Sequence, residues 1–364
     1  SKSLRAWLLG VLIVIAVNFW VGTHLATFVN SSALDECFVL ERRIAAYPDK
    51  QAVKVVVFGN SHALAGLRPP LIARALALPP NAVFSFALPG GPPQEMRLLA
   101  ERYLSQFPNA RMALCSIDEP FLVNSNDYRM RYWTRGDLFE RTRYATSRPG
   151  FDERLGLLLS CFVPIADFVT PIQEFLAADP RWVLHNILRR PVPSSYRRAL
   201  LNLKFPWGLS PPWDCLSAPD LRRLAVRAHR RQEFRECATG FMANEAHTPQ
   251  GLESLEALAQ TVNRHRCQFV LVGIPYPLQL SKAIQKRHAL ANRDYENRVA
   301  SFLKAQHQRE IPAPPPWENF DYYDTDHLNP QGAKLLAEWV RRHLDKNELA
   351  AIGVATKTRG PRSR

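Results

Sequence analysis

A serine and a histidine directly follow an apolar run early in the chain. The run at residues 53–58 ends in Gly59-Asn60-Ser61-His62. A serine hydroxyl becomes a useful nucleophile when an imidazole within hydrogen-bond reach takes its proton and a carboxylate orients that imidazole. Gly and Asn also suit a turn, and Ser also caps helices, so the stretch alone is equally typical of a structural turn. A nucleophile at Ser61 therefore requires an acid and a base elsewhere.

The second stretch of interest lies near the C-terminus, where residues 322–333 read YYDTDHLNPQGA. His327 is a candidate base, and Asp324 is three residues before it, so a short turn can bring the acid back to the imidazole. Asp326 is the alternative acid, although the three-residue spacing favours Asp324. The pair Asn329-Pro330 is itself typical of a helix start, so a plain capping turn is the competing interpretation.

Strand and helix signals alternate on both sides of a long irregular region, which predicts an α/β fold with a parallel sheet covered on both faces. In such sheets ligands bind beyond the carboxyl ends of the strands. Ser61, Gly90-Gly91, Asp118 and Pro275-Tyr276 each follow a predicted strand and should gather at one edge. We expect strands at 53–58, 83–88, 111–117 and 267–275, and helices at 69–78, 94–107, 248–266, 292–308 and 330–344.

The N-terminal segment predicts a membrane anchor. Residues 6–29 carry no formal charge and are about as long as a bilayer requires, roughly 20 residues. Lys2 and Arg5 precede the segment, so the positive-inside rule sends residues 31–364 to the outer side, which is the periplasm if the membrane is a bacterial inner membrane. A cleaved signal peptide is the alternative.

The remaining chain divides by composition. We expect an anchor at 1–30, a linker helix at 31–52, an α/β domain formed by 53–117 and 248–346, an insertion at 118–247 and a flexible basic tail at 347–364.

Lys and Arg outnumber Asp and Glu by 47 to 33, a formal net charge of +14. The charge is dispersed and no nucleic-acid motif accompanies it, so anionic polysaccharide or lipid head groups are the expected partners, and nucleic acid is not.

The cysteines and the motifs predict neither a metal nor a cofactor. None of the six cysteines forms a C-x-x-C pair, and no P-loop or dinucleotide fingerprint is present. Cys215 and Cys237 are the pair we would expect to form a disulfide, because both lie in the irregular region. Cys115 and Cys267 fall in predicted core strands and are expected to be free buried thiols.

Taken together, FGNSH after the first strand and D-x-x-H before the last helix resemble the SGNH/GDSL hydrolase superfamily. The resemblance implies a three-layer fold with flavodoxin-like winding and a triad of Ser61, His327 and Asp324. It also implies oxyanion donors at the backbone N–H of Ser61 and at Gly90 or Gly91.

The sequence departs from that family's pattern in two places. The first block has Asn where the family has Asp, and CSIDEP stands where the third block should supply an asparagine donor. No asparagine directly follows this strand, and Asn124 or Asn126 would have to fold back to replace it. These departures bear on catalytic strength more than on the fold.

The anchor and the insertion narrow the resemblance to membrane-tethered polysaccharide O-acetyltransferases, similar to the alginate O-acetyltransferases and the teichoic-acid D-alanylation protein. This implies acyl (acetyl) transfer through an acyl-Ser61 intermediate to a sugar hydroxyl or water, with a membrane-bound O-acyltransferase as partner. His62, Asn60 and Asp118 are the expected substrate contacts. The alternatives are a catalytically weak or inactive assembly protein of the same fold, and a binding module with one continuous basic surface.

Overall fold

The computed structural model describes residues 36–88, 90–116, 249–317, 322 and 326–354, with isolated helical positions at 9–10, 12–13, 16, 142, 151 and 155. The chain divides into two compact units, residues 1–45 with 127–193 and residues 46–126 with 194–364. In the first unit the structure describes helix α2, Glu36–Ala45. Its side chains Leu40 and Ile44 are buried. Most of the predicted insertion and most of the predicted anchor lie outside the described residues. Within the described residues, no helix is long and apolar enough to cross a bilayer.

The second unit is built on a five-stranded sheet, which confirms the predicted α/β class. The strands are β1 Val55–Gly59, β2 Val83–Ser85, β3 Met112–Ser116, β4 Gln268–Val272 and β5 Arg309–Ile311. They lie in the order β2-β1-β3-β4-β5, and every neighbouring pair is parallel. This is one of the two common doubly wound orders, and its switch point lies between β1 and β3.

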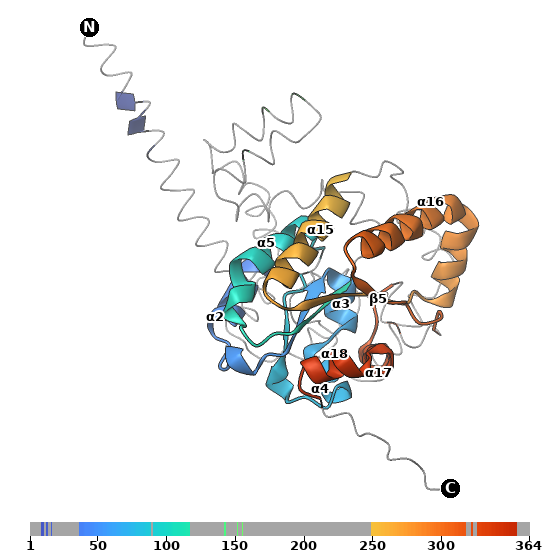
Figure 1. Cartoon of the computed structure of the whole chain (residues 1–364). Helices are drawn as coiled ribbons and strands as arrows, with labels where there is room; N and C mark the ends of the chain where they lie inside the picture. Colours follow the sequence, from blue (N-terminus) through green and yellow to red (C-terminus); the bar gives the residue numbers. More distant parts are fainter. Residues whose placement is uncertain are drawn as a thin grey trace, which may run out of the picture. The chain divides into compact units, whose positions relative to one another are not determined.

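Helices cover both faces of the sheet, as Figure 1 shows. Helices α5 (Pro93–Tyr103) and α15 (Pro249–Arg264) pack together on one face, and α3 (Ser61–Gly66), α4 (Pro69–Ala75) and α17 (Pro330–His343) pack on the other. In β1, Val55 and Val57 belong to the core cluster under α3, α4 and α17, while Phe58 stacks on Phe86 across the opposite face. Because both faces are buried, the strand is apolar at nearly every position.

Three elements differ from the sequence expectation. Helix α16 (Leu278–Ala305, 28 residues) begins well before residue 292, because its first turns bury few side chains and carry Lys and Arg that hide the apolar period. The edge strand β5 was not expected and follows α16 directly. Helix α18 (Lys346–Ala351) and the described residues up to 354 occupy the start of the segment expected to be a flexible tail.

The two described cysteines of the sheet are free and buried, as expected. Cys115 lies in β3 and Cys267 immediately precedes β4. Burial raises the pKa of the Cys115 thiol far above its ordinary value. Burial also raises the pKa of Cys267 to about 12, against a smaller lowering effect of Arg111. Both sulfurs therefore remain protonated thiols at neutral pH.

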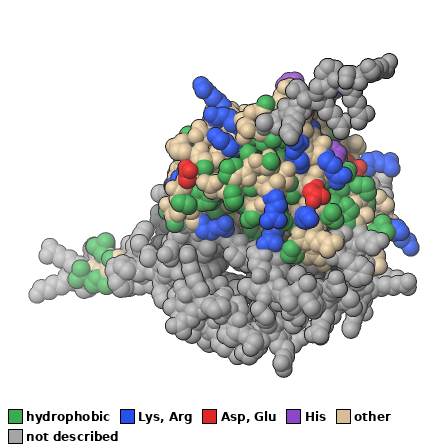
Figure 2. Space-filling view, turned by 90° about the horizontal axis from the view of Figure 1, so that it is seen from below, with side chains coloured by type: hydrophobic (Ala, Val, Ile, Leu, Met, Phe, Trp, Pro, Cys, Tyr) green, Lys and Arg blue, Asp and Glu red, His purple; other side chains and the backbone are tan. Residues whose placement is uncertain are grey.

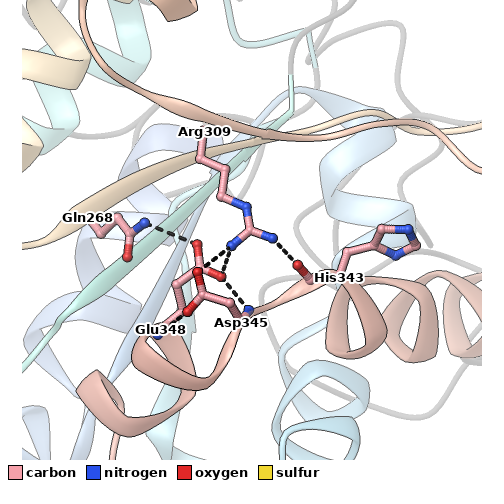
Figure 3. Close-up of polar contacts among 5 residues, drawn as sticks. All are labelled: Gln268, Arg309, His343, Asp345 and Glu348. Atoms are coloured by element: carbon pink, nitrogen blue, oxygen red, sulfur yellow. Dashed lines mark hydrogen bonds and ion pairs between the residues drawn. The ribbon is translucent and has the colours of Figure 1, made fainter.

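A polar cluster fastens the C-terminal helices to the sheet (Figure 3). Glu348 is 3% exposed, accepts a hydrogen bond of 3.0 Å from Gln268 Nε2 in β4 and pairs with Arg309 of β5. Arg309 also contacts Asp345 at 3.2 Å and the carbonyl of His343. Asp345 and Glu348 form the capping box that starts α18. One buried carboxylate thus joins two strands to α18.

We expect Glu348→Ala to lower the free energy of unfolding by about 3 kcal/mol, because it removes the buried partner of Arg309 and half of the capping box. The exposed Glu338→Ala on α17 is the matched control and should change stability by no more than about 0.5 kcal/mol. Urea denaturation of both variants measures the difference. Equal stabilities of the two variants would contradict the structural importance of the cluster.

Candidate active site

The turn between β1 and α3 presents Ser61, and its shape requires glycine and asparagine. Gly59 has φ +151, and a Cβ at this position would lie 2.3 Å from the Cβ of Ala63 and 2.8 Å from the carbonyl oxygen of Ser116. Asn60 is fully buried and its side chain accepts the N–H of His62 at 2.9 Å, which caps α3. Asn60, expected to contact substrate, therefore has a structural role, and Ser61 begins the helix.

His327 is held in place by the loop that leads into α17. Asn329 caps α17 by accepting hydrogen bonds from the N–H groups of Gln331 (2.9 Å) and Gly332 (3.0 Å), and its amide reaches the carbonyl of Tyr322. Tyr322 forms an antiparallel bridge with Leu328, and its hydroxyl donates to the carbonyl of Pro275 at 3.0 Å. The loop is therefore fixed on both sides of His327.

Close packing of α17 on α3 brings the two stretches together. A Cβ at Gly66 would lie 2.9 Å from the end of the Leu336 side chain and 3.2 Å from that of Leu328, so a larger residue would have to displace these side chains. The imidazole Nε2 of His327 lies 2.9 Å from Ser61 Oγ, although 266 positions separate them in sequence. The predicted contact between Ser61 and His327 is therefore present, at the sheet edge beside the switch point.

The carboxylate at the far side of the His327 ring belongs to Asp326. Its Oδ1 lies 2.9 Å from His327 Nδ1. Because a carboxylate accepts, Nδ1 carries the proton and Nε2 is left to accept the proton of the Ser61 hydroxyl. Asp324, which the sequence spacing favoured, lies outside the described residues. Among the described residues, the orienting contact is therefore made by Asp326, the alternative acid.

His62, an expected substrate contact, lies beside the Asp326 carboxylate. It is 4% exposed, and its Nε2 lies 3.2 Å from Asp326 Oδ2, in a poorly aligned ion-pair contact. Its ring lies against that of His327 with centroids 4.5 Å apart, and the ring of Tyr276 meets it edge-on at 5.9 Å. The sequence feature that points to the contact of His62 with Asp326 is its position directly after Ser61, at the start of a helix.

The two histidines determine the ionisation of Asp326. Burial alone would raise the pKa of this carboxyl, but the charge of His327 and its hydrogen bond, followed by the weaker hydrogen bond and charge of His62, hold the pKa well below its usual range. Asp326 is therefore ionised at neutral pH, as a group that orients an imidazole must be.

Of the other predicted site residues, the structure describes the two glycines but not Asp118. Gly91 donates its N–H to the carbonyl of Leu88 at 3.0 Å, so this amide serves the turn after β2. Gly90 adopts φ +61, a conformation that favours glycine, and is the better oxyanion candidate of the two. Ser116 is the last residue of β3, the strand after which the family pattern places an asparagine donor. Ser116 is fully buried. Asp118, Asn124 and Asn126 lie outside the described residues.

The same residues form the candidate metal cluster of the described part of the chain. One ligand atom each from His62, Asp326 and His327 lies within 4.8 Å of the others, close enough for one cation. A cation bound to these atoms would displace the protons that now lie between each ring and the carboxylate. The observed contacts fit a hydrogen-bonded triad better than a ligand set.

Basic side chains are dispersed on one face of the described residues. On the face drawn in Figure 2, Lys and Arg side chains are separated from one another by apolar and other side chains. This face does not carry the continuous basic surface that a dedicated module for anionic glycan or lipid would need.

Comparison of the sequence with protein-family models and with curated proteins finds no match.

Replacing each of the two candidate acids by asparagine tests the role of Asp326. We expect Asp326→Asn to lower Ser61 reactivity by a factor on the order of 10³–10⁴, because an amide favours the wrong tautomer of His327. Asp324→Asn is the control and should retain most of the reactivity. The measurement is the rate of acylation by p-nitrophenyl acetate. Loss confined to Asp324→Asn would return the role to the acid that the spacing favoured.

The lowered pKa of Asp326 also predicts a pH dependence of stability. The group is more acidic in the folded chain than in the unfolded chain, where a carboxyl has a pKa of about 3.9. Its contribution is therefore fully present above about pH 4 and is lost as the pH falls through the lower folded value. We expect the stability difference between wild type and Asp326→Asn to be constant near neutral pH and to shrink below about pH 4. A difference that disappears already near pH 6 would contradict this.

Proposed function

We propose that the chain is a serine-dependent acyltransferase or esterase that works through an acyl-Ser61 intermediate. The observation that carries this proposal is the line of contacts from Ser61 Oγ through the His327 ring to the Asp326 carboxylate, with 2.9 Å at each step. The three groups lie in the order and tautomer that activate a hydroxyl. Their place at the carboxyl edge of a doubly wound sheet is where such folds bind ligands.

The geometry supports a two-step transfer. In the first step His327 Nε2 accepts the Ser61 proton while Oγ attacks the acyl carbonyl, and the tetrahedral intermediate collapses as His327 returns that proton to the leaving oxygen. In the second step an acceptor hydroxyl gives its proton to Nε2 and attacks the acyl-serine, and Ser61 is regenerated as its oxygen takes the proton back. Asp326 stays ionised and stabilises the imidazolium in both steps.

The negative charge that develops on the carbonyl oxygen requires hydrogen-bond donors. The backbone N–H of Ser61, in the first turn of α3, and that of Gly90 are the proposed donors, and each such donor is worth roughly 2.7–4 kcal/mol in the transition state. If these two donors of the described part of the chain act without a third, transfer from an activated donor is favoured over vigorous hydrolysis of an unactivated ester.

The cellular role extends the family resemblance. We infer an SGNH-like enzyme tethered by residues 6–29 to a bacterial inner membrane, facing the periplasm and acting on acyl, chiefly acetyl, esters of an envelope polysaccharide. A membrane-bound O-acyltransferase would deliver the acyl group. The serine after the first strand, the histidine before the last long helix and the strand order β2-β1-β3-β4-β5 support the SGNH-like part of this proposal, and the charge-free segment 6–29 supports the tether.

Intact-mass spectrometry tests the nucleophile directly. The full-length chain is incubated with p-nitrophenyl acetate, and we expect a single acetyl adduct that maps to Ser61 because this hydroxyl is the one with an oriented base. Ser61→Ala should abolish the adduct. Ser105→Ala, which removes an exposed serine on the same domain, should leave it unchanged. A folded wild-type chain that forms no adduct would favour the assembly-protein alternative.

A further inference from the structure

One carboxylate in the site contacts two imidazole rings. Asp326 places Oδ1 2.9 Å from His327 Nδ1 and Oδ2 3.2 Å from His62 Nε2. A serine-histidine-acid triad uses the first contact and has no need of the second ring. His62 therefore calls for an explanation that the proposed reaction does not supply.

The orientation of the Asp326 carboxylate depends on more than its backbone position. Asp326 lies at a bend and directly precedes the histidine that it orients. Side chains of neighbouring residues in an extended chain point to opposite sides, so the contact between residues 326 and 327 depends on the bend at Asp326, and a second contact to the carboxylate limits its rotation. Free rotation of the carboxylate would turn Oδ1 away from Nδ1.

His62, by contrast, is fixed on a rigid element. It lies in the first turn of α3, and its backbone N–H is bonded to the Asn60 side chain at 2.9 Å. Its ring is 4% exposed and packs between the rings of His327 (4.5 Å) and Tyr276 (5.9 Å). Because Ser61 and His62 are adjacent on the same helix, one element positions both the nucleophile and the restraint on the acid.

We propose that His62 is a positioning residue, which holds Oδ2 of Asp326 so that Oδ1 faces His327 Nδ1. The inference rests on the proposed function for its effect on turnover, since an oriented Asp326 matters only if His327 acts as a base. The geometric part, that His62 determines the contact between Asp326 and His327, does not depend on turnover.

Two substitutions separate positioning from packing. His62→Phe keeps a ring against His327 and Tyr276 but removes the donor to Asp326. His62→Gln keeps an N–H donor of similar reach and removes the ring. Should the Phe variant not fold, His62→Met also fills the volume without a donor and replaces it. Thermal unfolding of each variant identifies those that retain the fold.

The experiment measures kcat and KM for p-nitrophenyl acetate, and the downfield proton resonance of His327 Nδ1–H, on the full-length chain. EDTA is present throughout, so that no cation can hold the carboxylate. We expect His62→Phe to lower kcat by about 10²-fold with KM nearly unchanged, because the base loses its oriented acid. The Nδ1–H resonance should shift or disappear. His62→Gln should restore most of kcat and the resonance.

The outcomes are distinct. Wild-type kcat and resonance in a folded His62→Phe variant would show that the ring only packs, and would overturn the proposal. A raised KM with unchanged kcat would make His62 a substrate contact and would overturn it as well. If the wild-type chain shows no turnover and forms no adduct, the enzymatic function fails, while the change of the His327 resonance in His62→Phe still decides the positioning role.

Discussion

The site depends on a turn that has no room for a side chain. β1 ends at Gly59 beside Ser116 of β3, and a Cβ at Gly59 would overlap Ala63 and the Ser116 carbonyl. The helix α3 can therefore start directly above the strand end. Its first residue, Ser61, is carried to the switch point of the sheet as a consequence of this turn. A looser connection would leave the same residues on a loop, without a fixed direction toward His327.

Two asparagines extend this constraint to both halves of the site. Asn60 caps α3 one residue before Ser61, and Asn329 caps α17 two residues after His327. Each side chain accepts backbone N–H groups, so each determines where its helix begins. The helices then pack closely at Gly66, which converts two local caps into one contact of 2.9 Å between Ser61 and His327. The positions of nucleophile and base are thus consequences of helix starts.

This explains which features could be predicted from sequence. Ser61 and His327 follow from apolar strands, turn residues and caps, which are local signals that the fold obeys. The three-residue spacing favoured Asp324, which lies outside the described residues, and that spacing carries no information on the contact that the adjacent Asp326 makes with His327 Nδ1. The contact of His62 with Asp326 was not predicted, because the two residues are 264 positions apart in sequence. The first turns of α16 were missed because a half-exposed helix shows little apolar period.

The buried thiols of the sheet carry a practical consequence. Cys115 and Cys267 lie in or beside adjacent strands of the sheet, and their high pKa keeps them as unreactive thiols in the folded chain. Neither competes with Ser61 for an electrophilic ester. Both become ordinary reactive cysteines when β3 separates from β4. The rate at which a thiol reagent alkylates these two cysteines therefore measures the rate of sheet opening in the unmodified protein.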